Sequence, residues 1–289
     1  MTAYERAEKL VELTSIQELA IARADALARI DELLDDKDIE VRIEALKALT
    51  SYPEAHDLWR RVLDLADDEP GPLRVAALSA LGRLICEGDL AGALEVGYEP
   101  DLELGEPPVD LFQDARLALV ERLSEPASPE ESRTALAGLS YLSSEPSVVA
   151  GIEACEASDQ LEERVWAVRC MGLGGDGQRW GKSIRAALEE DTEGLTLEAL
   201  WAAGRTELVD LAPLLGRTLK SSSQPEELRI AAANALAGLG GKAGAAHLLE
   251  VANSDEQDPV HEAAREALAS LTSPPVLGED DDASDDSDV

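Results

Sequence analysis

The sequence predicts an all-α fold in which similar helical hairpins follow one another along the chain. Two observations support this prediction. Apolar residues make up 45% of the chain and aromatic residues only 3%, so Leu and Ala must supply most of the core, and both are strong helix formers. A helical pattern also returns about every 32 residues. The alternating β-branched and aromatic segments that indicate strands do not occur in the sequence.

The repeat is defined by one recurring position, here called the slot, which is often arginine and is followed three residues later by alanine. The slots hold Arg42, Arg74, Ser132, Arg164, Thr196, Arg229 and His261, with Arg133 one place beyond Ser132. The successive spacings are 32, 58, 32, 32, 33 and 32 residues. A nearly constant period is typical of repeat proteins, and the long spacing equals one period plus 26 residues, which indicates an insertion.

Each unit contains two helical patterns, and the second helix carries the slot. Its core positions lie one residue before the slot and three, six and seven residues after it, which is one face of a helix. Glycine recurs near the expected end of the second helix, at Gly82, Gly172, Gly204 and Gly238. We expect these glycines to form left-handed caps. Turn residues that favour helix starts lie six residues before the slot, at Asp36, Asp68, Ser158, Ser223 and Asp255.

Segments such as "DIEVRIEALKALTS" from Asp38 and "QPEELRIAAANALAGLG" from Gln224 resemble HEAT repeats, and they look most like the short variety first named from phycobilisome lyases. The resemblance covers about residues 35–271. It implies a right-handed α-solenoid of HEAT-like helical hairpins. It also implies that turn aspartates pair with slot arginines between repeats, at Arg42, Arg74, Arg164 and Arg229, while Ser132 and Thr196 depart from the pattern.

The chain divides into a cap, a repeat array and a tail. Residues 1–34 form two amphipathic patterns that suit an N-terminal helical cap, and residues 35–272 form the array. Residues 273–289 are acidic and poor in apolar side chains, so we expect them to be disordered. The insertion, at about residues 87–110, is non-periodic and acidic in its latter part. It is either a second candidate binding surface or a decayed repeat.

The net charge of −35 restricts the partners of the chain. A field of this sign repels phosphate backbones and anionic membranes, so we expect no nucleic acid and no membrane as a partner. High salt tolerance or a GC-rich acidic proteome would explain the acidity, and the alternative is a dock for a basic partner. Cys155 and Cys170 lie in apolar patterns and are expected to be buried, reduced thiols. Without a signal peptide or a membrane-spanning run in the sequence, we expect a cytoplasmic monomer.

A candidate binding stripe follows from the outward positions of the second helices. In the geometry that the resemblance implies, the residues two, five and nine places after the slot face a concave surface. These positions hold residue types that dominate interface energetics. The predicted stripe consists of Arg83, Tyr141, Trp166, Arg169, Trp201, Arg205 and Asn234. The alternative is that Trp166 and Trp201 fill the core between repeats.

Motifs for catalysis, metals and cofactors are incomplete. A phosphate-binding loop ending in Gly181-Lys182-Ser183 would need glycine where Asp176 stands. Some HEAT-like proteins are iron hydroxylases with several His-Glu pairs, whereas this chain has one such pair, at His261, which we expect to fill a solvent-facing slot. We therefore expect no catalytic residues, no metal site and no cofactor.

The expected function is a non-enzymatic scaffold or adaptor that binds a protein, as yet unidentified, on the concave face of the solenoid. The alternative is a HEAT-like lyase or chaperone that handles a cofactor or its apoprotein, because bilin lyases carry the same repeat.

Overall fold

The computed structural model describes residues 3–17, 22–67, 71–95, 97–102, 106–190, 192–254 and 258–272. Within these ranges every regular element is a helix, so the predicted all-α class is confirmed. The predicted tail, at residues 273–289, lies outside the described residues, as do the turn residues Asp68 and Asp255. The chain divides into two compact units, residues 1–202 (unit 1) and residues 203–289 (unit 2).

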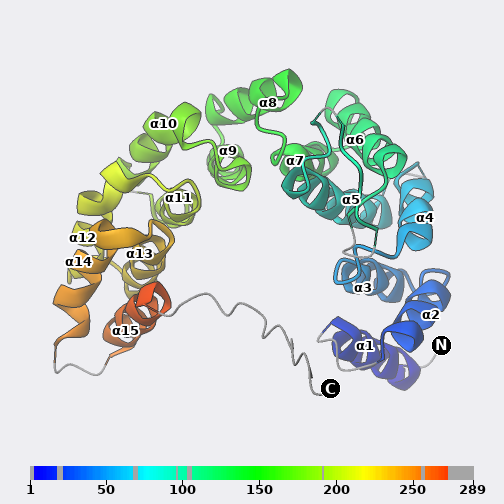
Figure 1. Ribbon diagram of the computed structural model, residues 1–289, viewed down its shortest axis with the longest axis horizontal. Coiled ribbons are helices and arrows are strands. Elements are labelled where there is room, and N and C mark those ends of the chain that lie inside the picture. The colour runs from blue at the N-terminus through cyan, green and yellow to red at the C-terminus, as the bar shows by residue number, and fades with distance from the viewer. Residues whose placement is uncertain are drawn as a thin grey trace, which may run out of the picture. The chain divides into compact units, whose positions relative to one another are not determined.

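Unit 1 alternates between the first and the second helix of each hairpin. The second helices are α3 (Ile39–Leu49), α5 (Pro72–Leu90), α7 (Pro129–Leu139), α9 (Leu161–Gly174) and α11 (Glu193–Arg205), whose last residues belong to unit 2. The first helices are α4 (His56–Asp67), α6 (Val109–Ser124), α8 (Pro146–Glu156) and α10 (Gly177–Glu189), and α1 (Ala3–Gln17) and α2 (Arg23–Leu33) precede them. Figure 1 shows two layers in this unit, with α3, α5, α7 and α9 on the inner side of its curve and α4, α6, α8 and α10 on the outer side.

Unit 2 continues the alternation. A short 3-10 helix (Val209–Leu211) leads into the first helices α12 (Ala212–Lys220) and α14 (Gly241–Ala252), which alternate with the second helices α13 (Glu226–Gly238) and α15 (Pro259–Thr272). Helix α13 packs against α15, and both contact α14. Each of the seven predicted slot helices therefore has a counterpart in the structure.

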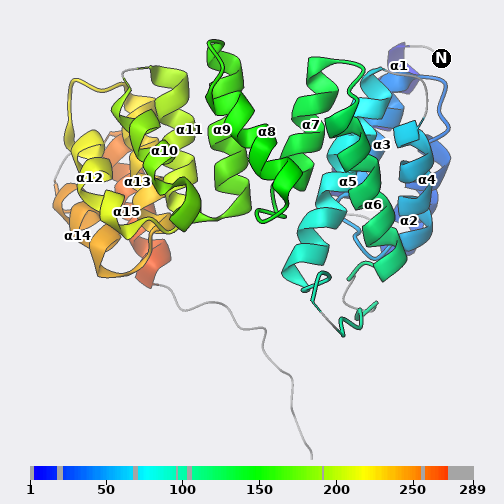
Figure 2. The ribbon, with the colours of Figure 1, turned by 90° about the horizontal axis from the view of Figure 1, so that it is seen from above.

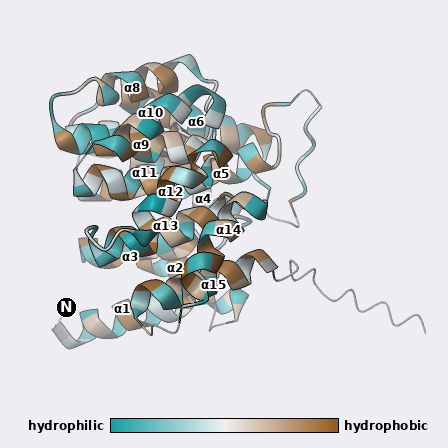
Figure 3. Cartoon of the chain, turned by 90° about the vertical axis from the view of Figure 1, so that its left-hand side faces the viewer, coloured by the Kyte–Doolittle hydropathy of each residue, from teal (hydrophilic) through white to brown (hydrophobic). Residues whose placement is uncertain are grey.

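The repeat positions predicted around the slot form part of the core. In α3, Val41, Ala45, Ala48 and Leu49 are fully buried. The equivalent residues of α13 are buried as well: Leu228, Ala232, Ala235 and Leu236. Apolar and polar stretches alternate along individual helices (Figure 3), as expected for helices that bury one face against their neighbours and expose the other. A repeat of this kind cannot bury its apolar face by itself, so each hairpin depends on its neighbours for stability.

The glycines expected at the helix ends have a different role. They are Gly82 in α5, Gly172 in α9, Gly204 in α11 and Gly238, the last residue of α13. None of the four has a positive φ, so the predicted left-handed caps are wrong. A Cβ on Gly82 would lie 2.8 Å from Cα of Gly138, and one on Gly204 would lie 3.0 Å from Cα of Ala235. These glycines allow neighbouring second helices to approach closely, and the left-handed cap of α9 is Gly175, at φ 66°.

Among the described residues, three slot arginines have partners other than the turn aspartates that the resemblance implied. Nε of Arg42 donates to the carbonyl oxygen of Leu34 at 2.8 Å, and Nε of Arg229 donates to that of Leu219 at 3.0 Å. Arg164 pairs instead with Glu190, just after α10, at 2.7 Å. The carbonyl groups at a helix C-terminus have no partner within the helix. Arg42 and Arg229 donate to such groups, so an arginine at the slot has a structural role even where it does not pair with a turn aspartate.

Arg74 and Glu131 are charged residues buried between α5 and α7. They are only 7% and 1% exposed, and their side chains lie 3.5 Å apart. Glu131 also accepts a hydrogen bond from the backbone N–H of Ala127 at 3.1 Å. Glu131 occupies the core position directly before the slot residue Ser132, where most repeats carry an apolar side chain. The Arg74–Glu131 pair therefore replaces apolar packing in this repeat.

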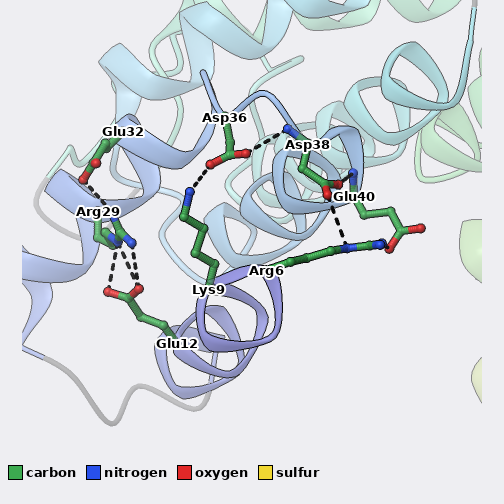
Figure 4. Close-up of polar contacts among 8 residues, drawn as sticks. All are labelled: Arg6, Lys9, Glu12, Arg29, Glu32, Asp36, Asp38 and Glu40. Atoms are coloured by element: carbon green, nitrogen blue, oxygen red, sulfur yellow. Dashed lines mark hydrogen bonds and ion pairs between the residues drawn. The ribbon is translucent and has the colours of Figure 1, made fainter. Parts of the chain in front are cut away.

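Helix α1 packs against α3, and ion pairs link it to the start of the array (Figure 4). Lys9 of α1 pairs with Asp36, in the turn before α3, and Glu12 of α1 accepts from Arg29 of α2 at 3.0 Å. Asp36 also accepts the backbone N–H of Asp38 at 2.8 Å. The hydrogen bond from Lys9 is the largest influence that lowers the pKa of Asp36. The role of residues 1–34 as a cap stays a prediction.

Candidate functional site

A groove lies over α5, α7 and α9, on the inner layer of unit 1. Its centre is a hollow of about 340 Å³, here called the aromatic hollow. Polar and aromatic side chains line it: Ser79, Arg83, Thr134, Tyr141, Trp166 and Arg169. Gly82, Ala137, Gly138 and Leu173 complete the lining. A second hollow of about 510 Å³ extends the groove to α3 and shares Ser79, Thr134 and Trp166, so Trp166 stands between the two.

Equivalent repeat positions on neighbouring helices build the aromatic hollow. Arg83 and Tyr141 both lie nine residues after their slots, and Trp166 and Arg169 lie two and five residues after Arg164. The close approach of α5 and α7 at their glycines brings the first two side chains to the same hollow. These four members of the predicted stripe therefore lie together.

The four tryptophans of the chain divide by layer. Trp59 in α4 and Trp180 in α10 are 0% and 4% exposed, as core residues are. Trp166 and Trp201, in second helices, are only half-buried. Trp201 packs against α9, where a Cβ added to Gly172 would lie 2.4 Å from its ring. Trp166 lines the groove, while Trp201 partly fills the contact between two repeats.

Arg169 is held between the hollow and the next repeat. Its guanidinium carbon lies 5.3 Å from the centroid of the Trp201 ring, within the range of a cation–π contact. Its Nη1 donates to Glu198 at 3.2 Å. Burial raises the pKa of Glu198, and the Arg169 charge acts in the opposite direction. These two contacts position an Arg169 side chain that is still 47% exposed.

The other predicted stripe residues do not line the aromatic hollow. Trp201 contacts Arg169, which lines the hollow, but does not line the hollow itself. Arg205, at the end of α11, and Asn234, in α13, are exposed residues of unit 2. Their part in binding remains a prediction.

The predicted stripe left out the charged residues that line the second hollow, which are Lys47, Glu130, Arg133 and Glu162. Arg133, which lies one place after its slot, lines the second hollow and pairs with Glu162 at 2.5 Å and Glu163 at 3.3 Å. Lys47 of α3 lines the same hollow and pairs with Glu44 at 2.6 Å. The sequence did carry a signal for Arg133, because it lies one residue after the slot. A shift of one residue turns a side chain by about 100° around the helix, away from the direction of the slot residue.

A third hollow, of about 420 Å³, lies between α2 and α4 and has the opposite character. Asp31, Glu54, His56 and Asp57 are its charged or titratable lining residues. Burial is the largest influence on His56 and lowers its pKa. The excess of acids here matches the chain as a whole, so this hollow shows no special chemistry.

The predicted insertion, at about residues 87–110, starts within a helix. Helix α5 continues through Leu90, so residues 87–90 are helical, and the segment that follows projects beyond the ends of the neighbouring helices (Figure 2). Leu90, Leu94 and Leu102 are exposed there. The hydroxyl group of Tyr98 donates to the carbonyl oxygen of Pro107 at 3.0 Å, which ties the two halves of the segment together. Its role as a second binding surface stays a prediction.

His261 and Cys155 do not lie as the sequence predicted. His261 is buried rather than solvent-facing. Asp258 accepts its backbone N–H at 2.9 Å and lies 2.6 Å from its Nδ1. Cys170 is buried as expected, but Cys155 is only half-buried, near Glu163. Burial is the main reason that the pKa is raised to about 11 for Cys155 and to about 12 for Cys170. Both thiols are therefore poor nucleophiles at neutral pH.

In the part of the chain that the structure describes, no group of three or more His, Cys, Asp or Glu side chains is placed to hold a metal ion. No helix in that part combines the length and the apolar character needed to cross a membrane.

Comparisons with known proteins agree with this architecture. A family model described as HEAT repeats matches residues 181–269, and no curated protein matches the chain. A solved structure of importin beta is similar with a TM-score of 0.52 and 15% identity, over 85% of this chain and 36% of that one. Human deoxyhypusine hydroxylase has a TM-score of 0.39 and 19% identity, over 90% of this chain and 88% of that one. Kap95p, in a complex with RanGDP, has a TM-score of 0.48 and 14% identity, over 93% of this chain and 38% of that one.

The repeated hairpins and the likeness to importin beta define an all-α solenoid. Residues 181–269 match the HEAT-repeat family model, and the fold of the chain is that of a HEAT-repeat α-solenoid, as the sequence predicted. The chain spans little more than a third of the importin beta structure, at 36%. The likeness to phycobilisome lyases in particular stays an expectation.

Proposed function

We propose that this chain is a non-enzymatic scaffold or adaptor that binds a protein partner in the groove over α5, α7 and α9. One observation carries the proposal: the aromatic hollow brings together Arg83, Tyr141, Trp166 and Arg169. Trp, Tyr and Arg are the residue types that dominate binding energy in protein interfaces. Half-buried side chains on a layer of packed helices also lose little freedom when a partner binds.

The shape of the groove favours a narrow protein segment as its occupant. The two hollows adjoin at Trp166 and extend over α3, α5, α7 and α9. A helix or an extended segment of a partner can place successive side chains in such hollows. The net charge of −35 supports a protein partner over nucleic acid or a membrane, and we extend the proposal to a cytoplasmic monomer.

Affinity capture from native lysate, followed by mass spectrometry, tests the proposal. The bait is the full chain, with Trp166→Ala and Arg169→Ala as variants. Arg179→Ala is a matched control, because Arg179 on the outer helix α10 is 43% exposed, lies 5.9 Å from the centroid of the Trp180 ring and pairs with Asp176 at 3.4 Å. Arg169 is similar in all three respects: it is 47% exposed, lies 5.3 Å from the centroid of the Trp201 ring and pairs with Glu198 at 3.2 Å.

We expect the partner to be lost from Trp166→Ala and Arg169→Ala and retained by Arg179→Ala. Retention by both groove variants, with unchanged circular dichroism, would contradict the proposal. Copurification of a coloured ligand would instead favour the lyase or chaperone alternative.

A further inference from the structure

The aromatic hollow differs in charge from the chain around it. Two arginines and no carboxylate are found among the residues that line it, although the whole chain has 60 acidic and 25 basic residues. The hollow between α2 and α4 shows the usual balance, since Asp31, Glu54 and Asp57 line it without a lysine or arginine. A lining whose charged residues are all arginines, in a strongly acidic protein, indicates a ligand that carries negative charge.

The two arginines have donors to offer such a ligand. Across the described ranges, Arg83 pairs with Glu87 one turn further along α5, and Arg169 donates through Nη1 to Glu198. A guanidinium group has five N–H donors, so each arginine keeps several for another acceptor. Arg83 and Arg169 are 46% and 47% exposed. Exposed ion pairs of this kind contribute little to stability, so the two arginines can turn towards a ligand at a small cost in free energy.

The rest of the lining suits an acidic side chain with an apolar neighbour. Trp166 and Tyr141 offer aromatic surface, and Ser79 and Thr134 offer hydroxyl groups that can donate to a carboxylate. Arginine binds a planar carboxylate particularly well, because two N–H groups can point at its two oxygens.

We infer that the aromatic hollow binds an acidic segment of a partner protein, in which an Asp or Glu adjoins an apolar or aromatic residue. Arg83 and Arg169 receive the carboxylate, and Trp166 and Tyr141 receive the apolar side chain. This inference rests on the proposed function and specifies its partner. Screening at physiological salt limits repulsion from carboxylates farther away than about 8 Å. Glu87 and Glu198 contact the two arginines directly, and the carboxylate of the ligand takes their place at the guanidinium groups.

A display library of random short peptides, selected on the full chain, tests the inference. Clones that also bind Trp166→Ala are discarded, so that only groove binders remain. We expect these binders to share an Asp or Glu beside an apolar residue. Their synthetic peptides should bind an Arg83→Glu, Arg169→Glu double variant with affinity lower on the order of a hundredfold. Arg179→Glu serves as the control and should change nothing.

A charge exchange makes the test reciprocal. Replacing the shared acid of the peptide by lysine should abolish binding to the natural chain and restore binding to the double variant. If the double variant does not fold, an Arg83→Gln, Arg169→Gln variant should lower the affinity on the order of tenfold.

Two results would overturn the inference in different ways. Groove binders that share no acid, or that are indifferent to the arginine substitutions, would show that the hollow does not select a carboxylate, while the proposed function would stand. A selection that yields no peptide dependent on Trp166 would contradict the proposed function as well.

Discussion

At the residue scale, glycines set the distance between neighbouring second helices. A Cβ at Gly82 would meet the backbone of Gly138, so α5 and α7 touch with no side chain between them. The same contact brings Arg83 and Tyr141 to one hollow. The packing of two glycines therefore determines part of the candidate site.

Gly82→Ala tests this packing, and Gly194→Ala is its matched control. Both substitutions place a stronger helix former within a helix, but a Cβ at Gly194 meets no atom within 4 Å. Because overpacking costs about 1–3 kcal/mol, we expect Gly82→Ala to be less stable than Gly194→Ala by about that amount. Urea unfolding of the two variants measures the difference, and equal midpoints would contradict the close contact.

The buried Arg74–Glu131 pair leads to a second prediction at this scale. Removing one partner of a buried pair leaves the other charge poorly compensated. We expect Glu131→Ala to lower the free energy of unfolding by about 3 kcal/mol. Glu250→Ala, which breaks an exposed pair with Lys220, should leave the thermal midpoint unchanged. Similar effects of the two substitutions would show that Glu131 is not buried with its partner.

At the scale of the element, α1 is the helix whose attachment depends most clearly on charge. Lys9 lowers the pKa of Asp36 below its usual 3.8. A carboxyl group whose pKa is lower in the folded state than in the unfolded state stabilises the fold at pH values above the unfolded-state pKa. This stabilisation is lost as the pH falls through the folded-state pKa. The link between α1 and the turn before α3 should therefore weaken below about pH 3.8.

Hydrogen exchange of residues 3–17, corrected for the intrinsic rate at each pH, measures this attachment. We expect protection of α1 to fall as the pH drops below about 3.8. Lys9→Met should reduce protection already at pH 7 and flatten its dependence on pH, whereas Lys220→Met should do neither. Protection that is insensitive to both pH and Lys9 would mean that the Lys9–Asp36 pair does not hold α1.

The order of the helices and their buried faces could be predicted from the sequence, because both depend on the period and on local propensity. The detailed contacts could not. Gly82 and Gly175 look alike in the sequence, but only the neighbouring helix shows that one serves packing and the other a cap. Arg42 donates to a carbonyl oxygen at the end of α2, and His261 is buried, since the surroundings of a slot depend on tertiary structure.

The candidate site could be predicted in part for the same reason. Arg83, Tyr141, Trp166 and Arg169 hold outward repeat positions, so the period was enough to place them on one face. The period could not show that these four share a hollow or that Arg133 joins the groove. It also gave no sign that acids are missing from that lining.

At the scale of the whole molecule, the net charge of −35 works against a compact fold. Salt screens this repulsion, and at 1 M the Debye length falls to about 3 Å. We expect the thermal midpoint to rise as NaCl increases. A rise that continues to molar salt favours salt adaptation over a dock for a basic partner as the reason for the acidity. A midpoint that falls with salt would show that ion pairs outweigh the general repulsion.

The scaffold proposal depends on which layer of unit 1 meets the partner. A photo-crosslinking amino acid at position 79 stands where the two hollows of the groove meet, and one at position 117 stands on the exposed side of α6, in the outer layer. Crosslinking in native lysate, read by mass spectrometry, compares the two positions. We predict that the partner crosslinks to position 79 and not to position 117. Equal crosslinking at both positions, or crosslinking at 117 alone, would contradict binding in the groove.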